Sequence, residues 1–148
     1  MARNDLIIRA RPSDVFAVLS DPDSYGEWVV GSKRIRDHDR RWPKPGSRFH
    51  HTVGVGPLTV KDNSKVLELE RDKRLVLEAR VRPFGTATVD LRLKPVRRGK
   101  ATKVTMREEA RGGRLRRTWN PVFDAATHAR NAVALRRLKR MVEARSGE

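Results

Sequence analysis

The C-terminal segment from Asn120 to Arg145 limits the possible folds more than any other stretch, because it alone is long and regular enough for a full helix. Asn120 is a favourable N-cap residue, and Pro121 stands at the first helical position, where its missing N–H costs nothing. The preceding sequence consists mainly of the short runs that indicate strands. We therefore predict one long helix packed on a sheet.

The expected inward face of this helix changes along its length. At about 100° per residue, the second half places apolar side chains on one face. These are Ala134, Leu135, Leu138, Met141 and Val142. In the first half the same face carries Phe123, Asp124, Thr127 and Asn131, with His128 at its edge. Either the helix packs on a core and then lines a wet cavity, or its first half overhangs the sheet and these polar groups are solvated.

A second strip of small apolar residues lies on another side of the helix, among several arginines. It comprises Val122, Ala126, Ala129 and Val133. This strip is compatible with a partner contact, as in a homodimer, and equally with small residues beneath long arginine side chains.

The length of 148 residues indicates a single domain over residues 1–148. At this size about 68–70% of the surface of the unfolded chain is buried on folding. That is enough for a core and for a ligand cavity.

The charge balance is strongly basic, with 34 Lys and Arg against 18 Asp and Glu and a net charge of +16. Such a balance permits binding to nucleic acid or to an anionic membrane. The basic residues are spread along the chain, however, and only 5% of residues are aromatic, so stacking platforms for single strands are scarce. We do not expect nucleic acid as the main partner. A basic nucleic-acid-binding module is the third alternative, and it predicts duplex binding that falls steeply with salt.

The chain contains no cysteine, which excludes disulfides, thiolate chemistry and Cys-based metal sites. His50 and His51 are adjacent on an expected strand, so they point to opposite faces and cannot readily chelate one metal. The first residues lack the apolar run of a signal peptide, and no stretch approaches transmembrane length. We expect a cytoplasmic protein with no metal and no cofactor.

Segments with strand character follow one another through the middle of the chain. They are residues 4–11, 29–39, 47–55, 58–70, 74–82, 86–95 and 103–110. A short helix capped by Ser13 is expected at 13–20, after the first strand. The separators are of hairpin length, which predicts an antiparallel meander. Because several strands have one apolar and one charged side, the long helix should cover one face of the sheet and leave the other wet.

Four stretches carry a resemblance to a known family: residues 11–28 (RPSDVFAVLSDPDSYGEW), 45–49 (PGSRF), 74–78 (RLVLE) and 99–105 (GKATKVT). Together with the order of elements, they resemble the polyketide cyclase/dehydrase-like proteins of the START-like (SRPBCC) superfamily. The resemblance implies an α+β helix-grip fold. Its curved, seven-stranded antiparallel sheet would wrap around the long C-terminal helix, with two short helices after the first strand and a cavity between sheet and helix. Such families bind lipids, sterols, hormones or polyketides, and some catalyse cyclisation or dehydration, so the fold does not settle the function.

Two residues are the candidates for catalysis. His51 shares its strand face with Phe49 and should point inward, where it is either an acid–base group or a histidine satisfied by a neighbour. Glu108 shares its face with Met106, and an inward carboxylate indicates an ion pair with an arginine or a site, unless the strand ends before it. Asp62 is a weaker candidate of the same kind.

A few convergent polar groups in an apolar pocket are what a small-molecule site needs. Large rings are available to line such a pocket or plug its entrance, although each also suits an ordinary core; Phe84 is one of them. The predicted ligand-binding residues are Trp28, Phe49, His51, Met106, Glu108, Trp119, Phe123, Asp124, Thr127 and Asn131.

We predict binding of a small, largely apolar or amphipathic ligand, such as a lipid or a polyketide-like molecule. A cyclase- or dehydratase-like enzyme is the first alternative. Binding needs only a cavity, whereas the enzyme also needs an acid–base pair within it.

Overall fold

The computed structural model describes residues 2–29, 32–38, 40, 42–55, 58–81, 85–112 and 120–146. The helical elements are α1 (Pro12–Leu19), the 3₁₀ turn η1 (Pro22–Ser24), α2 (Tyr25–Trp28), the 3₁₀ turn η2 (Arg97–Gly99) and α4 (Pro121–Ser146). The strands are β1 (Ala2–Ile8), β2 (Ser32–His38), β3 (Arg48–Val55), β4 (Leu58–Glu70), β5 (Arg74–Val81), β6 (Gly85–Val96) and β7 (Ala101–Gly112).

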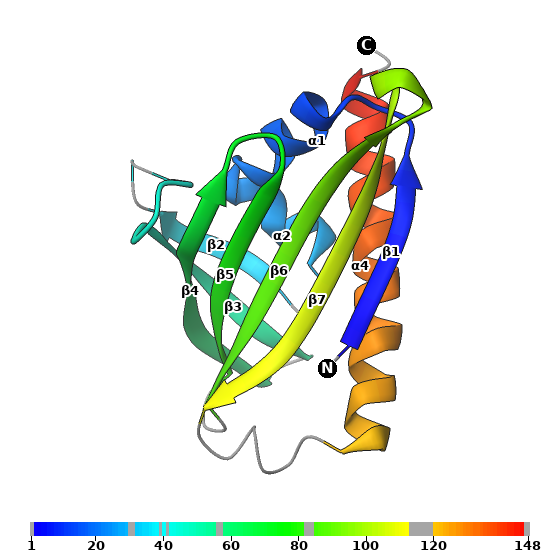
Figure 1. Cartoon of the computed structure of the whole chain (residues 1–148). Helices are drawn as coiled ribbons and strands as arrows, with labels where there is room; N and C mark the ends of the chain where they lie inside the picture. Colours follow the sequence, from blue (N-terminus) through cyan, green and yellow to red (C-terminus); the bar gives the residue numbers. More distant parts are fainter. Residues whose placement is uncertain are drawn as a thin grey trace.

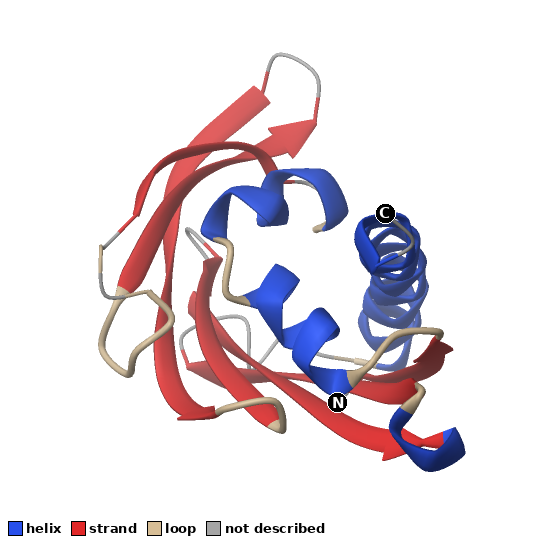
Figure 2. Cartoon of the chain, turned by 90° about the horizontal axis from the view of Figure 1, so that it is seen from above, coloured by secondary structure: helices blue, strands red, loops and turns tan. Residues whose placement is uncertain are grey.

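The strands form one antiparallel sheet in the order β1-β7-β6-β5-β4-β3-β2. The first strand lies beside the last, and the remaining neighbours follow the meander. The sheet curves, and the helices lie on its concave side, with α4 running along β1 and β7 (Figures 1 and 2). The predicted α+β class, with a curved antiparallel sheet and a C-terminal helix, is confirmed.

The second half of α4 packs on the sheet as its pattern predicts. Leu135, Leu138 and Val142 are buried in the hydrophobic core, and Met141 packs partly buried against it. In the first half, Thr127 and Asn131 are also buried. The interpretation in which that half overhangs the sheet with solvated polar groups is therefore wrong for these two residues.

The sheet's inward side chains change size from one end to the other. The strand register places Leu75, Leu91, Met106 and Asn4 in one cross-strand row. Further along the same face, the row is Ser64, Ala79, Ala87 and Ala110. Large side chains thus occupy the concave face at one end of the sheet. At the other end the small side chains occupy less of the space between the sheet and α4.

The short helices close the end of the sheet where the large side chains lie. Val15, Phe16, Val18 and Leu19 of α1 are buried in the core. Helix α1 begins one residue earlier than expected, with Arg11 and not Ser13 as its N-cap. The reason is Pro12, which suits the first helical position and needs no hydrogen-bond acceptor there. The first strand is also shorter than expected and ends at Ile8.

The free edge of β1 is covered by charged side chains of α4. Lys139 Nζ donates to the Ile7 carbonyl at 2.9 Å, and Glu143 accepts hydrogen bonds from the backbone N–H of Arg9 at 3.4 Å and from its guanidinium Nε at 3.3 Å. An uncovered edge strand would present unpaired backbone groups to other chains. These contacts supplement the core packing that holds α4 on the sheet.

Candidate functional site

A cluster of polar side chains lies where the first half of α4 faces β1 and β7. We call it the polar cluster, and it consists of Asn4, Glu108, Thr127, Arg130 and Asn131. Strand β7 supplies Glu108 because its inward positions alternate through Val104 and Met106. Strand β1 supplies Asn4 by the same alternation, and three residues come from two turns of α4.

The Glu108–Arg130 ion pair connects the sheet to the helix. Arg130 donates from its guanidinium to a carboxylate oxygen of Glu108 at 2.6 Å. The Glu108 side chain is only 10% exposed, whereas that of Arg130 is 45% exposed. The pair therefore has a buried anionic end and a cationic end at the surface, so it marks where the polar cluster meets solvent.

Asn4 joins the cluster from the neighbouring strand. It lies directly opposite Met106, and Glu108 is two residues further along β7 on the same face. Side chains in such diagonal positions have Cα atoms about 7–8 Å apart. The Asn4 amide Nδ2 donates to the backbone carbonyl of His128 at 3.0 Å, which ties β1 to the first half of α4.

Two buried amide atoms in the cluster have no hydrogen-bond partner among the described residues. They are Asn4 Oδ1 and Asn131 Nδ2, on side chains that are 6% and 2% exposed. An unsatisfied buried donor or acceptor costs about 1–3 kcal/mol each. Native proteins satisfy such groups in most cases, so each one needs an explanation.

A cleft of about 170 Å³ lies next to the cluster, between β1 and α4. Its walls are Asn4, Asp5, Leu6, Ala132, Leu135 and Arg136. Ala132 contributes only a small side chain to the helix wall of this cleft. The packing between β1 and α4 is therefore incomplete beside Asn4.

Several predicted site residues lie on the inner surface. Met106, Glu108, Thr127 and Asn131 are buried there, and Asp124 is half-buried at the start of α4. Trp28 is fully buried in the core, where its ring lies 4.9 Å from that of Tyr25 and its indole N–H donates to the Ser24 hydroxyl. A ligand contact for Trp28 stays a prediction.

Other predicted residues lie outside the part that the structure describes. The backbone register places Phe49 opposite Ser64 and His51 opposite Asp62, so each pair shares a strand face. The side chains of Phe49, His51, Asp62 and Phe123 are outside the described residues, as are Phe84 and Trp119 entirely.

Sequence reasoning missed Asn4 and Arg130. Asn4 had a usable signal, because it alternates with Leu6 and Ile8 and so stands as a polar residue on the apolar side of its strand. Arg130 had none, since it is one of many arginines on the helix. Only the position of Glu108 across the interface distinguishes it.

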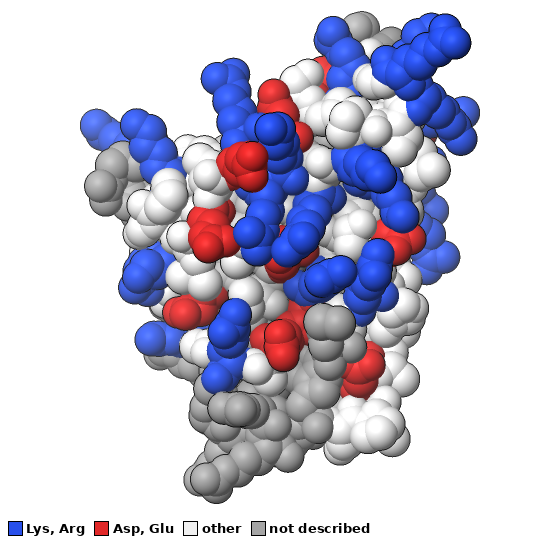
Figure 3. Space-filling view, in the orientation of Figure 1, with Lys and Arg blue, Asp and Glu red and all other residues white. Residues whose placement is uncertain are grey.

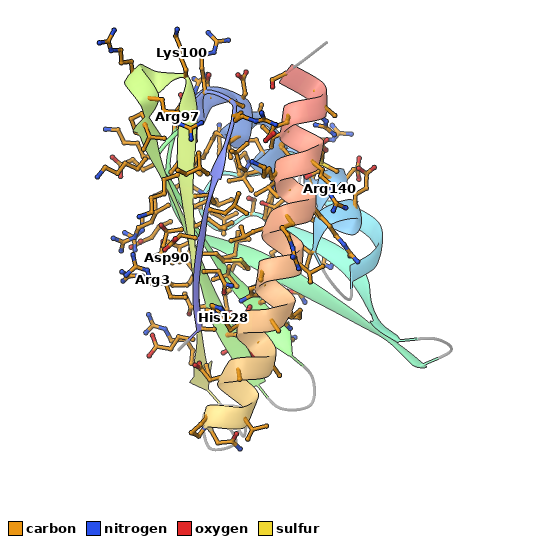
Figure 4. All side chains as sticks on the ribbon, turned by 90° about the vertical axis from the view of Figure 1, so that its right-hand side faces the viewer. Arg3, Asp90, Arg97, Lys100, His128 and Arg140 are labelled. Carbon is orange, nitrogen blue, oxygen red and sulfur yellow. The ribbon has the colours of Figure 1, made fainter. Side chains whose placement is uncertain are left out.

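Many charged side chains lie on the convex face of the sheet, which Figure 3 shows. On it, Arg74 holds Asp90 with two hydrogen bonds of 3.1 and 2.9 Å, and Arg92 adds further ones. Burial alone would raise the pKa of Asp90, but the hydrogen bonds from Arg74 and Arg92 outweigh it and hold that pKa below its ordinary value. Figure 4 shows Arg3 and Asp90 on the side of the sheet away from α4, and Arg97 and Lys100 at the turn between β6 and β7, so this charge does not belong to the polar cluster.

Among the residues that the structure describes, no group of His, Asp and Glu side chains is arranged to hold a metal ion. Within the same part of the chain, no helix has the length and apolar character needed to cross a membrane.

Comparison with known proteins now gives the family. A family model described as polyketide cyclase / dehydrase and lipid transport matches residues 3–143. The chain belongs to this family, and the resemblance seen in the sequence is confirmed. No curated protein sequence matches the chain significantly.

Solved structures share the fold at low sequence identity. CV1439 from Chromobacterium violaceum has a TM-score of 0.73 and 18% identity, covering 95% of this chain and 96% of its own. SA2116 from Staphylococcus aureus has a TM-score of 0.70 and 9% identity, covering 99% and 96%. The di-domain ARO/CYC protein BexL from the BE-7585A biosynthetic pathway has a TM-score of 0.73 and 18% identity over 96% of this chain and 46% of its own. These likenesses establish the helix-grip fold.

Proposed function

We propose that this protein binds a small, largely apolar ligand, lipid or polyketide-like, between the sheet and α4. Residues 1–148 would form one seven-stranded helix-grip domain around that ligand. The observation that carries the proposal is Asn131, whose amide is 2% exposed and whose Nδ2 lacks a partner among the described residues. A buried amide left unsatisfied beside apolar packing is expected where a ligand supplies the missing group.

The surroundings of Asn131 support a ligand and not only a structural defect. Thr127 lies one turn earlier on the same buried face, and Glu108 and Arg130 bring a charged pair to the edge of the cluster. At this end of the sheet, the inward row of Ser64, Ala79, Ala87 and Ala110 has small side chains that leave room for a ligand. An apolar ligand body would lie over those small side chains, with its polar group at the cluster.

The first test is mass spectrometry of the protein purified from its own host, in the native state and after solvent extraction. A stoichiometric apolar or amphipathic molecule is the expected result. Titration with the neutral fluorophore N-phenyl-1-naphthylamine then measures binding directly. A folded protein that carries no molecule and gives no saturable response to the fluorophore would overturn the proposal.

A matched pair of variants tests where the ligand binds. Thr127→Trp fills the buried face of α4 and should reduce fluorophore affinity at least tenfold, whereas Ala129→Trp, on the exposed side of the same turn, should leave it unchanged. Thr127→Leu is the milder replacement if the tryptophan prevents folding, and circular dichroism identifies folded samples. Equal affinities in folded Thr127 and Ala129 variants would exclude this location.

A cyclase- or dehydratase-like activity on a polyketide-type substrate is the second candidate. It is favoured by the description of the family and by structural neighbours named as ARO/CYC proteins. His51 and Glu108 are the proposed acid–base residues. Turnover of a poly-β-keto thioester that His51→Ala abolishes, with fluorophore affinity unchanged, would support the enzyme; absence of turnover by the unmodified protein would exclude it for that substrate.

A further inference from the structure

The two unsatisfied amide atoms of the polar cluster have complementary chemistry. The orientation of the Asn4 amide is determined by its contact with α4: the His128 carbonyl only accepts, so the group that reaches it must be Nδ2. The atom left without a partner is then the Oδ1 acceptor, while the unpartnered atom on Asn131 is the Nδ2 donor. One acceptor and one donor are thus left over in the same cluster.

Both amides belong to side chains near the interface between β1 and α4. Asn4 binds the carbonyl of His128, and Asn131 follows three residues later, about 4.5 Å further along the helix axis. Asn4 and Ala132, the residue after Asn131, line the same cleft. Asn131 therefore lies within one helical turn of the point that Asn4 reaches.

We propose that Asn4 and Asn131 form a hydroxyl-binding subsite, and that the ligand carries a hydroxyl group on its apolar body. The hydroxyl donates its proton to Asn4 Oδ1 and accepts a hydrogen bond from Asn131 Nδ2. This inference rests on the proposed function, because it assigns the polar group of the same ligand.

Other polar groups satisfy only one of the two atoms. A ketone, ether or carboxylate oxygen accepts from Asn131 but offers nothing to Asn4 Oδ1, and an ammonium group donates to Asn4 but cannot accept from Asn131. A hydroxyl alone among these does both. Both amide atoms are closed to water in the present packing, so the ligand must part β1 and α4 slightly, and the adjacent cleft of about 170 Å³ supplies the room.

The test compares three probes of similar shape: 2-naphthol, 2-methoxynaphthalene and 2-methylnaphthalene. 2-Naphthol carries a hydroxyl, which donates and accepts. The methoxy oxygen of 2-methoxynaphthalene only accepts, and 2-methylnaphthalene has no hydrogen-bonding group. Displacement of N-phenyl-1-naphthylamine gives the affinity of each. The unmodified protein should bind 2-naphthol about tenfold more tightly than 2-methylnaphthalene, with 2-methoxynaphthalene between them, as expected for one well-placed hydrogen-bonding group.

Variants assign the preference to the two amides. Asn131→Leu keeps the side-chain size and removes the donor, and it should bring the ratio of the two affinities to within about twofold of one; Asn4→Leu should do the same. Asn63→Leu, on β4 and several strands away from β1, should leave the ratio of the 2-naphthol and 2-methylnaphthalene affinities unchanged. Because Asn131 Nδ2 makes no hydrogen bond in the described structure, Asn131→Leu carries the test even if Asn4→Leu fails to fold.

The outcomes distinguish a failure of the hydroxyl subsite from a failure of the proposed ligand binding. If the unmodified protein binds none of the naphthalenes and no fluorophore, the proposed function fails. If it binds 2-naphthol and 2-methylnaphthalene equally, or keeps its preference in Asn131→Leu, the ligand site stands and the hydroxyl subsite is overturned.

Discussion

The Glu108 carboxylate on β7 and the Arg130 guanidinium on α4 lie 2.6 Å apart, yet the Arg130 side chain is 45% exposed and that of Glu108 only 10%. The two partners are therefore not equivalent. If Glu108 is lost, Arg130 can turn into water. If Arg130 is lost, a buried carboxylate stays behind without its cation.

This asymmetry gives a first prediction. Arg130→Met should lower the free energy of unfolding by about 2 kcal/mol, because an unpaired buried charge is costly. Glu108→Gln should lower it by only about 1 kcal/mol or less. Urea unfolding at neutral pH measures both. Arg140→Met, at an exposed position of the same helix, is the control, and an Arg130 variant no less stable than this control would contradict the ion pair.

The interaction of Asp90 with Arg74 and Arg92 on the convex face predicts that the stability of the fold depends on pH. Its pKa lies below the ordinary value of 3.8 in the folded protein, because the hydrogen bonds from Arg74 and Arg92 outweigh the effect of burial. Asp90 therefore contributes stability at pH values above its unfolded pKa, and this contribution is lost as the pH falls through the lower folded value.

The measurement is thermal unfolding of the protein and of Asp90→Asn between about pH 6 and pH 2, around the ordinary carboxyl pKa. The unmodified protein should be the more stable at pH 6, and the difference should shrink below about pH 4. Asp5→Asn, at an exposed carboxylate on β1, should show a smaller change. A difference that stays constant to pH 2 would mean that Asp90 titrates normally.

Asn131 should reduce stability in the absence of ligand. Asn131→Leu removes a buried donor without a partner at little change in volume, so the free energy of unfolding should rise by about 1 kcal/mol. Chemical denaturation of ligand-free protein measures the change, and Asn63→Leu should stay within about 0.5 kcal/mol of the unmodified protein. A clear loss of stability in Asn131→Leu would show that the amide is satisfied in the folded protein.

The hairpin between β6 and β7 holds Arg98 in the left-handed region, at φ 58° and ψ 35°. Residues with a Cβ atom pay about 1–2 kcal/mol for this conformation, and glycine does not. Glycine relieves this strain but makes the unfolded chain more flexible, which offsets part of the gain. Arg98→Gly should therefore raise the free energy of unfolding by about 0.5 kcal/mol, seen as a slightly higher melting temperature. Lys100→Gly, with φ −80° in the same hairpin, should lower it. Equal effects of the two substitutions would contradict the strain.

Periodicity predicted the fold well because burial follows it closely. The alternation in residues 86–95 placed Val89, Leu91 and Leu93 on the covered side, and all three are buried. Boundaries were less accurate. The first strand ends at Ile8 because the chain bends at Arg9 and Ala10, and no residue type before Pro12 marks that bend.

The candidate site was only partly predictable. The parity of Glu108 and the face shared by Thr127 and Asn131 showed which side chains point inward, and their burial follows. Their mutual placement was not accessible, since it depends on how α4 lies across β1 and β7. The Glu108–Arg130 pair and the Asn4 contact with His128 join residues 22 and 124 positions apart.

The sequence by itself determined the antiparallel sheet, the long C-terminal helix and its division into an apolar and a polar half, because local alternation and helical spacing decide which side chains are buried. Only the tertiary structure decided which polar groups meet. Asn4, Glu108 and Asn131 come together because α4 docks on the sheet through the buried Leu135, Leu138 and Val142, while Lys139 and Glu143 add contacts at the edge of β1. Hydrogen bonds act over about 3 Å, so whether a buried amide finds a partner depends on this docking and cannot be read from periodicity.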